Sequence, residues 1–156
     1  MKRREFCALL GGAAAAIPWP ASAELAQPAR RAGQRLIGAW RFVSSVNTRE
    51  DGSTFNRWSQ NATGILMFDG EGNFSHIITG SESFLFGSKN FCAFGTYSID
   101  EAGKTIVSRI EGSSISRLNG AVQRRVITSL TASELRYANF VTASGTRVDA
   151  VWKRTK

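Results

Sequence analysis

Hydrophobic and polar residues alternate with a period of two along most of the chain after Leu36. Turn-forming pairs such as Asp51-Gly52 and Asp69-Gly70 interrupt this alternation. A period of two is typical of β-strands, because successive side chains point to opposite faces of a sheet. The pattern predicts strands at residues 40–47, 54–59, 64–68, 73–78, 93–99, 105–111, 122–130, 134–141 and 147–153.

The short connections between these strands predict consecutive antiparallel hairpins. About eight strands suffice to close a sheet into a barrel that has room for side chains or one small ligand. Closure also removes the exposed strand edges that promote aggregation. We therefore predict an all-β fold, an antiparallel up-and-down barrel of about 8–9 strands, in preference to a β-sandwich.

Residues 79–92 interrupt the alternation for longer than any other segment, and they include Phe84, Phe86 and Phe91. We expect this segment to form an irregular loop. Its position between two strands makes it a candidate lid over the mouth of the barrel.

The first residues of the chain predict a secretion signal. Arg3 and Arg4 belong to a basic start, an apolar run follows, and Ala21-Ser22-Ala23 matches a small-residue cleavage site. The apolar run is much shorter than the roughly 20 residues that span a bilayer, so we expect no transmembrane segment. The paired arginines before Phe6 are similar to a twin-arginine signal, and an ordinary secretory signal is the alternative.

Three segments follow from this pattern: a signal peptide at 1–23, an N-terminal arm at 24–35 and a β-barrel domain at 36–156. We expect the arm to include a short helical turn. The predicted location is periplasmic or secreted, after cleavage near Ala23.

The formal net charge of the chain is +8, and removal of residues 1–23 leaves +6. The basic residues are scattered and form no stripe with interleaved aromatics, which argues against nucleic-acid binding. Cleavage also removes Cys7, so Cys92 remains alone and no internal disulfide forms. Because Phe91 and Ala93 flank Cys92, we expect a buried, inert thiol.

The single histidine limits the catalytic arrangements that the chain can build. His76 alternates with Phe74 and Ile78, so it should point to the apolar side of its strand. It is then a core histidine that is hydrogen-bonded to a neighbouring strand, a polar anchor for a ligand, or a general acid–base. The first interpretation is favoured over the other two.

No cluster of histidine, cysteine and carboxylate residues suggests a metal site, and no glycine-rich loop suggests a phosphate, so no cofactor is predicted. Arg124 alternates with Val122 and Val126 on an apparently apolar face, whereas Arg125 should face outward. A buried arginine needs a carboxylate or an anionic ligand. The favoured interpretation instead places Arg124 near the rim of the barrel with its head in water.

Trp40 starts the first strand and should share a face with Phe42, Ser44 and Val46. We expect its indole to close the floor of the barrel under a basic side chain of the last strand. The sequence leaves open whether that side chain is Lys153 or Arg154.

Several motifs together resemble the lipocalins and, more specifically, the bacterial lipocalin-like domain family. Gly38-Ala39-Trp40 is similar to the glycine–x–tryptophan start of these barrels, and the wider matching stretches are Leu36–Ser44, Gly64–Gly70, Phe94–Asp100, Ile110–Ser113, Gln123–Arg125 and Val151–Arg154. The resemblance implies a lipocalin-type barrel with an internal cavity and no defined activity. Many members carry histidines where this chain has Ser108 and Arg109, so no role of those histidines carries over.

We interpret the chain as an exported binding protein for a small hydrophobic or amphipathic molecule. The candidate ligand-binding residues are those predicted to face inward: Phe42, Leu66, Phe68, Phe74, His76, Ile78, Tyr97, Arg124 and Trp152. On the strand that contains Leu66 and Phe68, the opposite face, with Ile65 and Met67, is nearly as apolar.

Two alternative functions remain. One is an isomerase or cyclase that uses His76 with Tyr97 or Arg124. The other is a packed barrel with a structural or partner-binding role and no ligand. The ligand, the pathway and the oligomeric state stay open.

Overall fold

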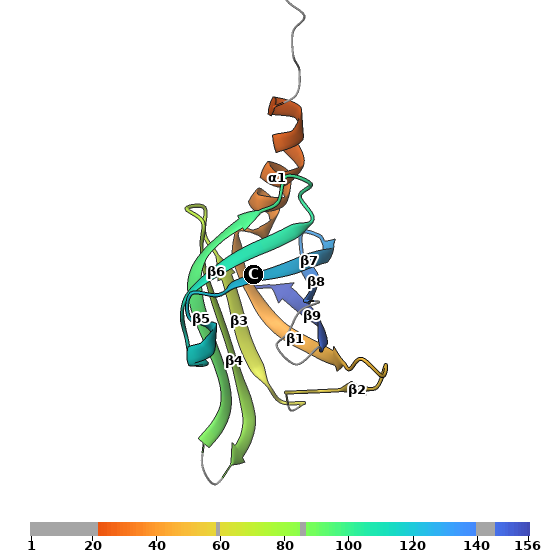
Figure 1. Cartoon of the computed structure of the whole chain (residues 1–156), viewed down its shortest axis with the longest axis vertical. Coiled ribbons are helices and arrows are strands. Elements are labelled where there is room, and N and C mark those ends of the chain that lie inside the picture. Colours follow the sequence, from red (N-terminus) through yellow and green to blue (C-terminus); the bar gives the residue numbers. More distant parts are fainter. Residues whose placement is uncertain (1–21, 59, 85–86, 140–145) are drawn as a thin grey trace, which may run out of the picture.

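A long helix precedes the β-structure of the chain. The computed structural model describes residues 22–58, 60–84, 87–139 and 146–156. Helix α1 (Ser22–Leu36) occupies the segment where an arm with a short helical turn is expected, and it stands at one end of the barrel (Figure 1). The predicted signal peptide lies almost entirely outside the described residues.

The described strands are β1 (Gly38–Thr48), β2 (Thr54–Phe55), β3 (Thr63–Phe68), β4 (Asn73–Phe84), β5 (Gly87–Ile99), β6 (Thr105–Ser113), β7 (Val122–Leu130), β8 (Glu134–Asn139) and β9 (Arg147–Arg154). They form one nine-stranded antiparallel sheet in which β1 and β3 to β9 follow one another in chain order and β2 lies beside β1. Strand β1 also pairs with β9, from Trp40 opposite Arg154 to Thr48 opposite Arg147, so the sheet closes on itself. The two-residue β2 pairs only with the end of β1, outside the closed ring of eight strands.

This closed up-and-down arrangement confirms the predicted fold class, with a short 3-10 helix, η1 (Ser116–Leu118), between β6 and β7. The β4–β5 hairpin extends past the end of the barrel that is opposite α1 (Figure 1). Residues 79–84 and 87–92 are therefore strand, and the expected irregular lid was wrong in this respect. Residues 85 and 86, and the side chains of 81–89, lie outside the described residues.

The end of the barrel next to α1 is filled by an apolar core. Trp40 is completely buried there, and its Nε1 donates a hydrogen bond to the Leu36 carbonyl at 2.8 Å. The other core residues are mostly aliphatic or aromatic, and they include Leu66, Phe68, Phe74, Ile106, Ile110 and Leu135. Because Met67 is exposed while Leu66 and Phe68 are buried, the structure decides which face of β3 lines the interior.

Arg154 closes this end over the Trp40 indole, and its guanidinium carbon lies 4.1 Å from the ring centroid. The expected basic side chain of the last strand is therefore Arg154, whereas Lys153 is exposed. Gly38 makes this contact possible, because a Cβ at this position would lie 2.6 Å from an Arg154 nitrogen. Gly38 also has φ +128°, which side chains rarely adopt.

β-Bulges change which residues face inward. A shift in the pairing of β1 between Phe42 and Ser44 turns Ser45 and Asn47 toward the interior, where both are buried. The prediction that Ser44 and Val46 share a face with Trp40 and Phe42 was therefore wrong, and both residues are exposed.

Candidate functional site

A cavity of about 330 Å³ occupies the half of the barrel that lies away from α1. Side chains from β1, β4, β5, β7, β8 and β9 line it, together with the segments around β2 and η1. The residues from these two segments, which include Trp58 and Leu118, belong to the connections at that end of the barrel. The sheet therefore supplies the walls of the cavity, and the connections border its rim.

Aromatic rings form much of the inner wall. The centroid of the buried Trp152 ring lies 5.3 Å from that of Phe42 and 5.2 Å from that of His76, both in edge-to-face geometry. Phe91 meets His76 edge-to-face at 4.9 Å, and Tyr137 stacks on Trp152 at 6.5 Å. These rings offer a rigid apolar surface to a bound molecule.

Arg125 enters the cavity from β7 and is only 5% exposed. One of its terminal nitrogens donates to Ser108 Oγ at 2.9 Å, and the other donates to Gln123 Oε1 at 2.6 Å. Its guanidinium carbon also lies 5.6 Å from the centroid of the Tyr137 ring. The three partners that the described part of the chain supplies to this buried cation are electrically neutral.

Several buried polar atoms in the cavity have no hydrogen-bond partner among the described residues. They are Ser45 Oγ, Asn47 Nδ2 and both ring nitrogens of His76. Trp152 Nε1 also makes no hydrogen bond of normal geometry. Since buried polar groups in proteins are nearly always hydrogen-bonded, such a concentration in one cavity indicates groups that are kept for a bound molecule or for water.

The protonation states of the two titratable rings follow from their burial. Burial holds the pKa of His76 well below its usual value, and the positive charge of Arg125 lowers that pKa further. The imidazole is therefore neutral at pH 7, with one nitrogen as donor and the other as acceptor. Burial raises the pKa of the Tyr137 hydroxyl, against a smaller opposing effect of Arg125, so the phenol keeps its proton.

The structure brings four of the predicted ligand-binding residues to the cavity wall: Phe42, His76, Ile78 and Trp152. It places Leu66, Phe68 and Phe74 in the packed core of the other half. Tyr97 also lies there, with its ring 4.8 Å from Phe68 and its hydroxyl donating to the Asp69 carbonyl at 2.8 Å.

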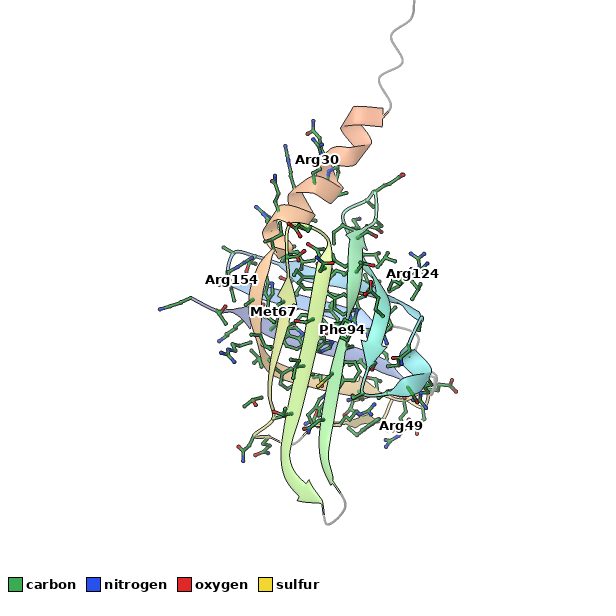
Figure 2. The ribbon with its side chains drawn as sticks, turned by 90° about the vertical axis from the view of Figure 1, so that its left-hand side faces the viewer. Arg30, Arg49, Met67, Phe94, Arg124 and Arg154 are labelled. Atoms are coloured by element: carbon green, nitrogen blue, oxygen red, sulfur yellow. The ribbon has the colours of Figure 1, made fainter. Side chains whose placement is uncertain are left out.

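The prediction that Arg125 faces outward was wrong, and Arg124 does not line the cavity. Arg124 is exposed on the outside of the barrel, where Figure 2 shows it, and Arg125 is the inward-facing residue. The apolar residues Val122 and Val126 suggested the inward face of β7, but Gln123 and Arg125 occupy it. The inward face of this strand is polar because it borders the cavity.

Ser45, Asn47 and Tyr137 line the cavity and were not predicted from the sequence. The alternation in β1 gave no sign of the bulge that turns Ser45 and Asn47 inward. The signal for Tyr137 was present, because Tyr137 alternates with Leu135 in its strand and both are buried.

The expected hydrogen-bonded core histidine is not what the structure shows, because neither His76 nitrogen has a partner among the described residues. The polar set considered for catalysis is not assembled either, since Tyr97 and Arg124 lie away from the cavity. A fully packed barrel is contradicted by the cavity itself.

Two further observations concern other functions. Among the described residues, no group of three or more histidine, cysteine and carboxylate side chains is arranged to hold a metal ion. No helix in the described ranges is long and apolar enough to cross a membrane.

Cys92 is exposed, so the expectation of a buried thiol was wrong.

No protein-family model and no curated protein sequence matches this chain. Among solved structures, a lipocalin-like protein from Bacteroides uniformis ATCC 8492 is similar, with 19% identity, a TM-score of 0.48 and an alignment over 78% of this chain and 99% of that protein. Bovine odorant-binding protein, solved with a selenium-containing odorant, has 19% identity and a TM-score of 0.45 over 80% of this chain and 73% of its own.

A redesigned β-barrel, mFAP1, bound to DFHBI, has 18% identity and a TM-score of 0.46 over 80% of this chain and 99% of its own. Likenesses of this size carry no argument about function. The lipocalin-like fold is established by the strand order and the β1–β9 closure of the chain itself.

Proposed function

We propose that this chain is a binding protein that holds one small amphipathic molecule inside its barrel. The cavity carries the proposal, because its volume of about 330 Å³ lies in the range of small-molecule sites. Its aromatic walls suit an apolar body, and its unpartnered Ser45, Asn47 and His76 groups suit a polar end. Eight-stranded barrels have the size to hold one such ligand.

The polar groups favour binding over catalysis. None of the described residues that line the cavity is Asp or Glu, so His76 has no carboxylate beside it to orient the imidazole or stabilise its charge. A neutral, aromatic-packed imidazole with both nitrogens unpartnered serves well as a hydrogen-bonding anchor.

The test is a titration with the neutral probe N-phenyl-1-naphthylamine, followed by its fluorescence, together with native mass spectrometry of the purified chain. We expect saturable uptake of one probe per chain. Ala150→Leu should weaken uptake at least tenfold, because Ala150 is buried and lines the cavity. Ala132→Leu is the matched control, since Ala132 is exposed in a turn.

Two results would overturn this function. One is the absence of saturable uptake combined with a ligand-free mass. The other is uptake that Ala150→Leu leaves unchanged, because the probe would then bind outside the cavity.

We also propose that residues 1–23 direct export and are removed near Ala23, which places the barrel in the periplasm or outside the cell. The basic start, the short apolar run and Ala21-Ser22-Ala23 support this proposal. Cell fractionation and intact mass should find a chain that begins at Glu24 in the exported fraction. Replacing Arg3 and Arg4 by lysine should block a twin-arginine route; a full-length mass outside the cytoplasm would contradict cleavage.

A further inference from the structure

We propose that the ligand carries one negative charge, as a carboxylate, and that Arg125 binds it. This inference rests on the proposed function and specifies the chemistry of the ligand's polar end. The observation behind it is a buried arginine that faces a cavity and has only neutral partners among the described residues.

Arg125 has N–H donors that its two side-chain hydrogen bonds do not use. A guanidinium has five N–H donors, and the bonds to Ser108 and Gln123 use one on each terminal nitrogen. The remaining N–H groups suit a carboxylate, which guanidinium groups bind in a planar, two-pronged arrangement. Ser108 and Gln123 hold the guanidinium in place without neutralising it.

The charges around the cavity also favour an anionic ligand. The charged residues that line it are all arginines: Arg57, Arg117 and Arg125. No described lining residue is acidic, and the ion pairs that the structure shows, such as Arg136 with Glu134, lie on the surface. A buried cation without a counter-charge is strongly disfavoured, so one anion that enters the cavity restores the balance.

The exposed Arg57 and Arg117 lie at the rim and raise the local concentration of anions there. A single buried cation favours a monoanion, because a dianion would leave a net negative charge in the barrel. The apolar body of the same molecule would lie against Phe42, Phe91 and Trp152.

Two neutral groups in the same cavity are able to donate to the second face of a carboxylate. Tyr137 keeps its phenolic proton and lies against Arg125. Asn47 Nδ2 is a buried donor without a partner among the described residues. Together with Arg125, they make an arrangement that binds an acid better than the matching alcohol.

The experiment compares 2-naphthoate with 2-naphthalenemethanol, which have the same apolar body and differ in charge. We expect wild-type protein to bind the acid roughly 10- to 100-fold more tightly, the range for hydrogen bonds to charged groups. Arg125→Met should abolish this preference by weakening acid binding while keeping alcohol binding. Arg124→Met is the matched control, because Arg124 neighbours Arg125 but points outward, and it should keep the preference.

The binding of the neutral alcohol to Arg125→Met shows that the variant is folded, and circular dichroism checks this independently. Inorganic phosphate alone should not compete at millimolar concentration, because it lacks the apolar body. Equal affinities for acid and alcohol in wild type, or a preference that survives Arg125→Met, would overturn the charge assignment and leave the proposed function standing. If neither compound nor the neutral probe binds, the proposed function itself fails.

Discussion

Two arginines at opposite ends of the barrel use their guanidinium groups in different ways. Arg154 donates to the Ala132 carbonyl at 2.8 Å, to the Ile37 carbonyl at 2.7 Å and to the Arg35 carbonyl, and it lies on Trp40. Two of these acceptors lie at the end of helix α1, where the helix dipole favours a cation. Within the described ranges, Arg125 has only two hydrogen-bond acceptors, both neutral side chains, and it faces a cavity.

Two buried tryptophans show the same difference between the two halves of the barrel. Trp40 and Trp152 are both fully inaccessible to solvent. The indole nitrogen of Trp40 is bonded to Leu36, whereas that of Trp152 has no partner of normal geometry among the described residues. Among the described residues, the buried side-chain polar atoms without a hydrogen-bond partner therefore belong to residues that line the cavity, and none belongs to the core next to α1.

The largest effect should come from Trp40→Ala, which we expect to lower the free energy of unfolding by about 4 kcal/mol, as for other large buried side chains. The change removes the indole from the core and the aromatic surface beneath Arg154. Urea unfolding measures it. Trp58→Ala, at the cavity rim, should cost less than about 1.5 kcal/mol. A similar loss in both variants would show that the two halves do not differ.

Arg154→Met should lower the free energy of unfolding by about 2–3 kcal/mol, because it removes three hydrogen bonds and a cation–π contact. The affinity for 2-naphthoate should stay within twofold of wild type. Arg125→Met should show the reverse, with weaker acid binding and no loss of stability, since a buried charge disappears. Lys153→Met, on an exposed neighbour, is the control for Arg154. A loss of acid binding in Arg154→Met would break the distinction between the two arginines.

His76 should make stability depend on pH. The unfolded chain takes up a proton near the usual pKa of about 6.5, whereas burial keeps the folded imidazole neutral to much lower pH. The contribution of neutral His76 to stability is therefore fully present above pH 7, and it decreases as pH falls below 6.5, by at most about 1.4 kcal/mol per pH unit. Urea titrations at several pH values measure this slope.

His76→Leu should flatten the dependence between pH 5 and 7, because the chain contains no other histidine. An unchanged slope in this variant would mean that His76 is protonated in the folded protein or that other groups govern the dependence.

The smallest effect concerns the outside of the barrel. In a Cys7→Ser background, Cys92 should react with Ellman's reagent in the folded protein, because it is exposed on β5. In the double variant Cys92→Ser, Ala93→Cys the thiol lies on the next residue of β5, which faces the interior. Its reaction should be at least tenfold slower, since Ala93 is buried. Equal rates at both positions would contradict the assigned faces of β5.

Much of the fold was predictable from local pattern. The nine predicted strands correspond to the nine observed, because alternation and turn residues are local properties of the sequence. The contact between Trp40 and a basic residue of the last strand was also predictable, and the structure assigned it to Arg154. The extended hairpin at residues 79–92 was missed because its alternation is irregular.

The candidate site was less predictable. Phe42, His76, Ile78 and Trp152 were identified because hydrophobic neighbours marked their faces. Arg125 was assigned to the wrong face because a cavity wall is partly polar, which reverses the usual relation between hydrophobicity and the inward direction.

The sequence by itself determined the class of fold, the number and order of the strands and the tryptophan at the start of the barrel. The tertiary structure alone decided that Ser45, Asn47 and Arg125 share one cavity. Bulges and strand register set the inward direction of each side chain, and they arise from pairing between distant segments. Local alternation does not reveal such pairing. A register shift of one residue reverses the direction of every side chain that follows it in the strand.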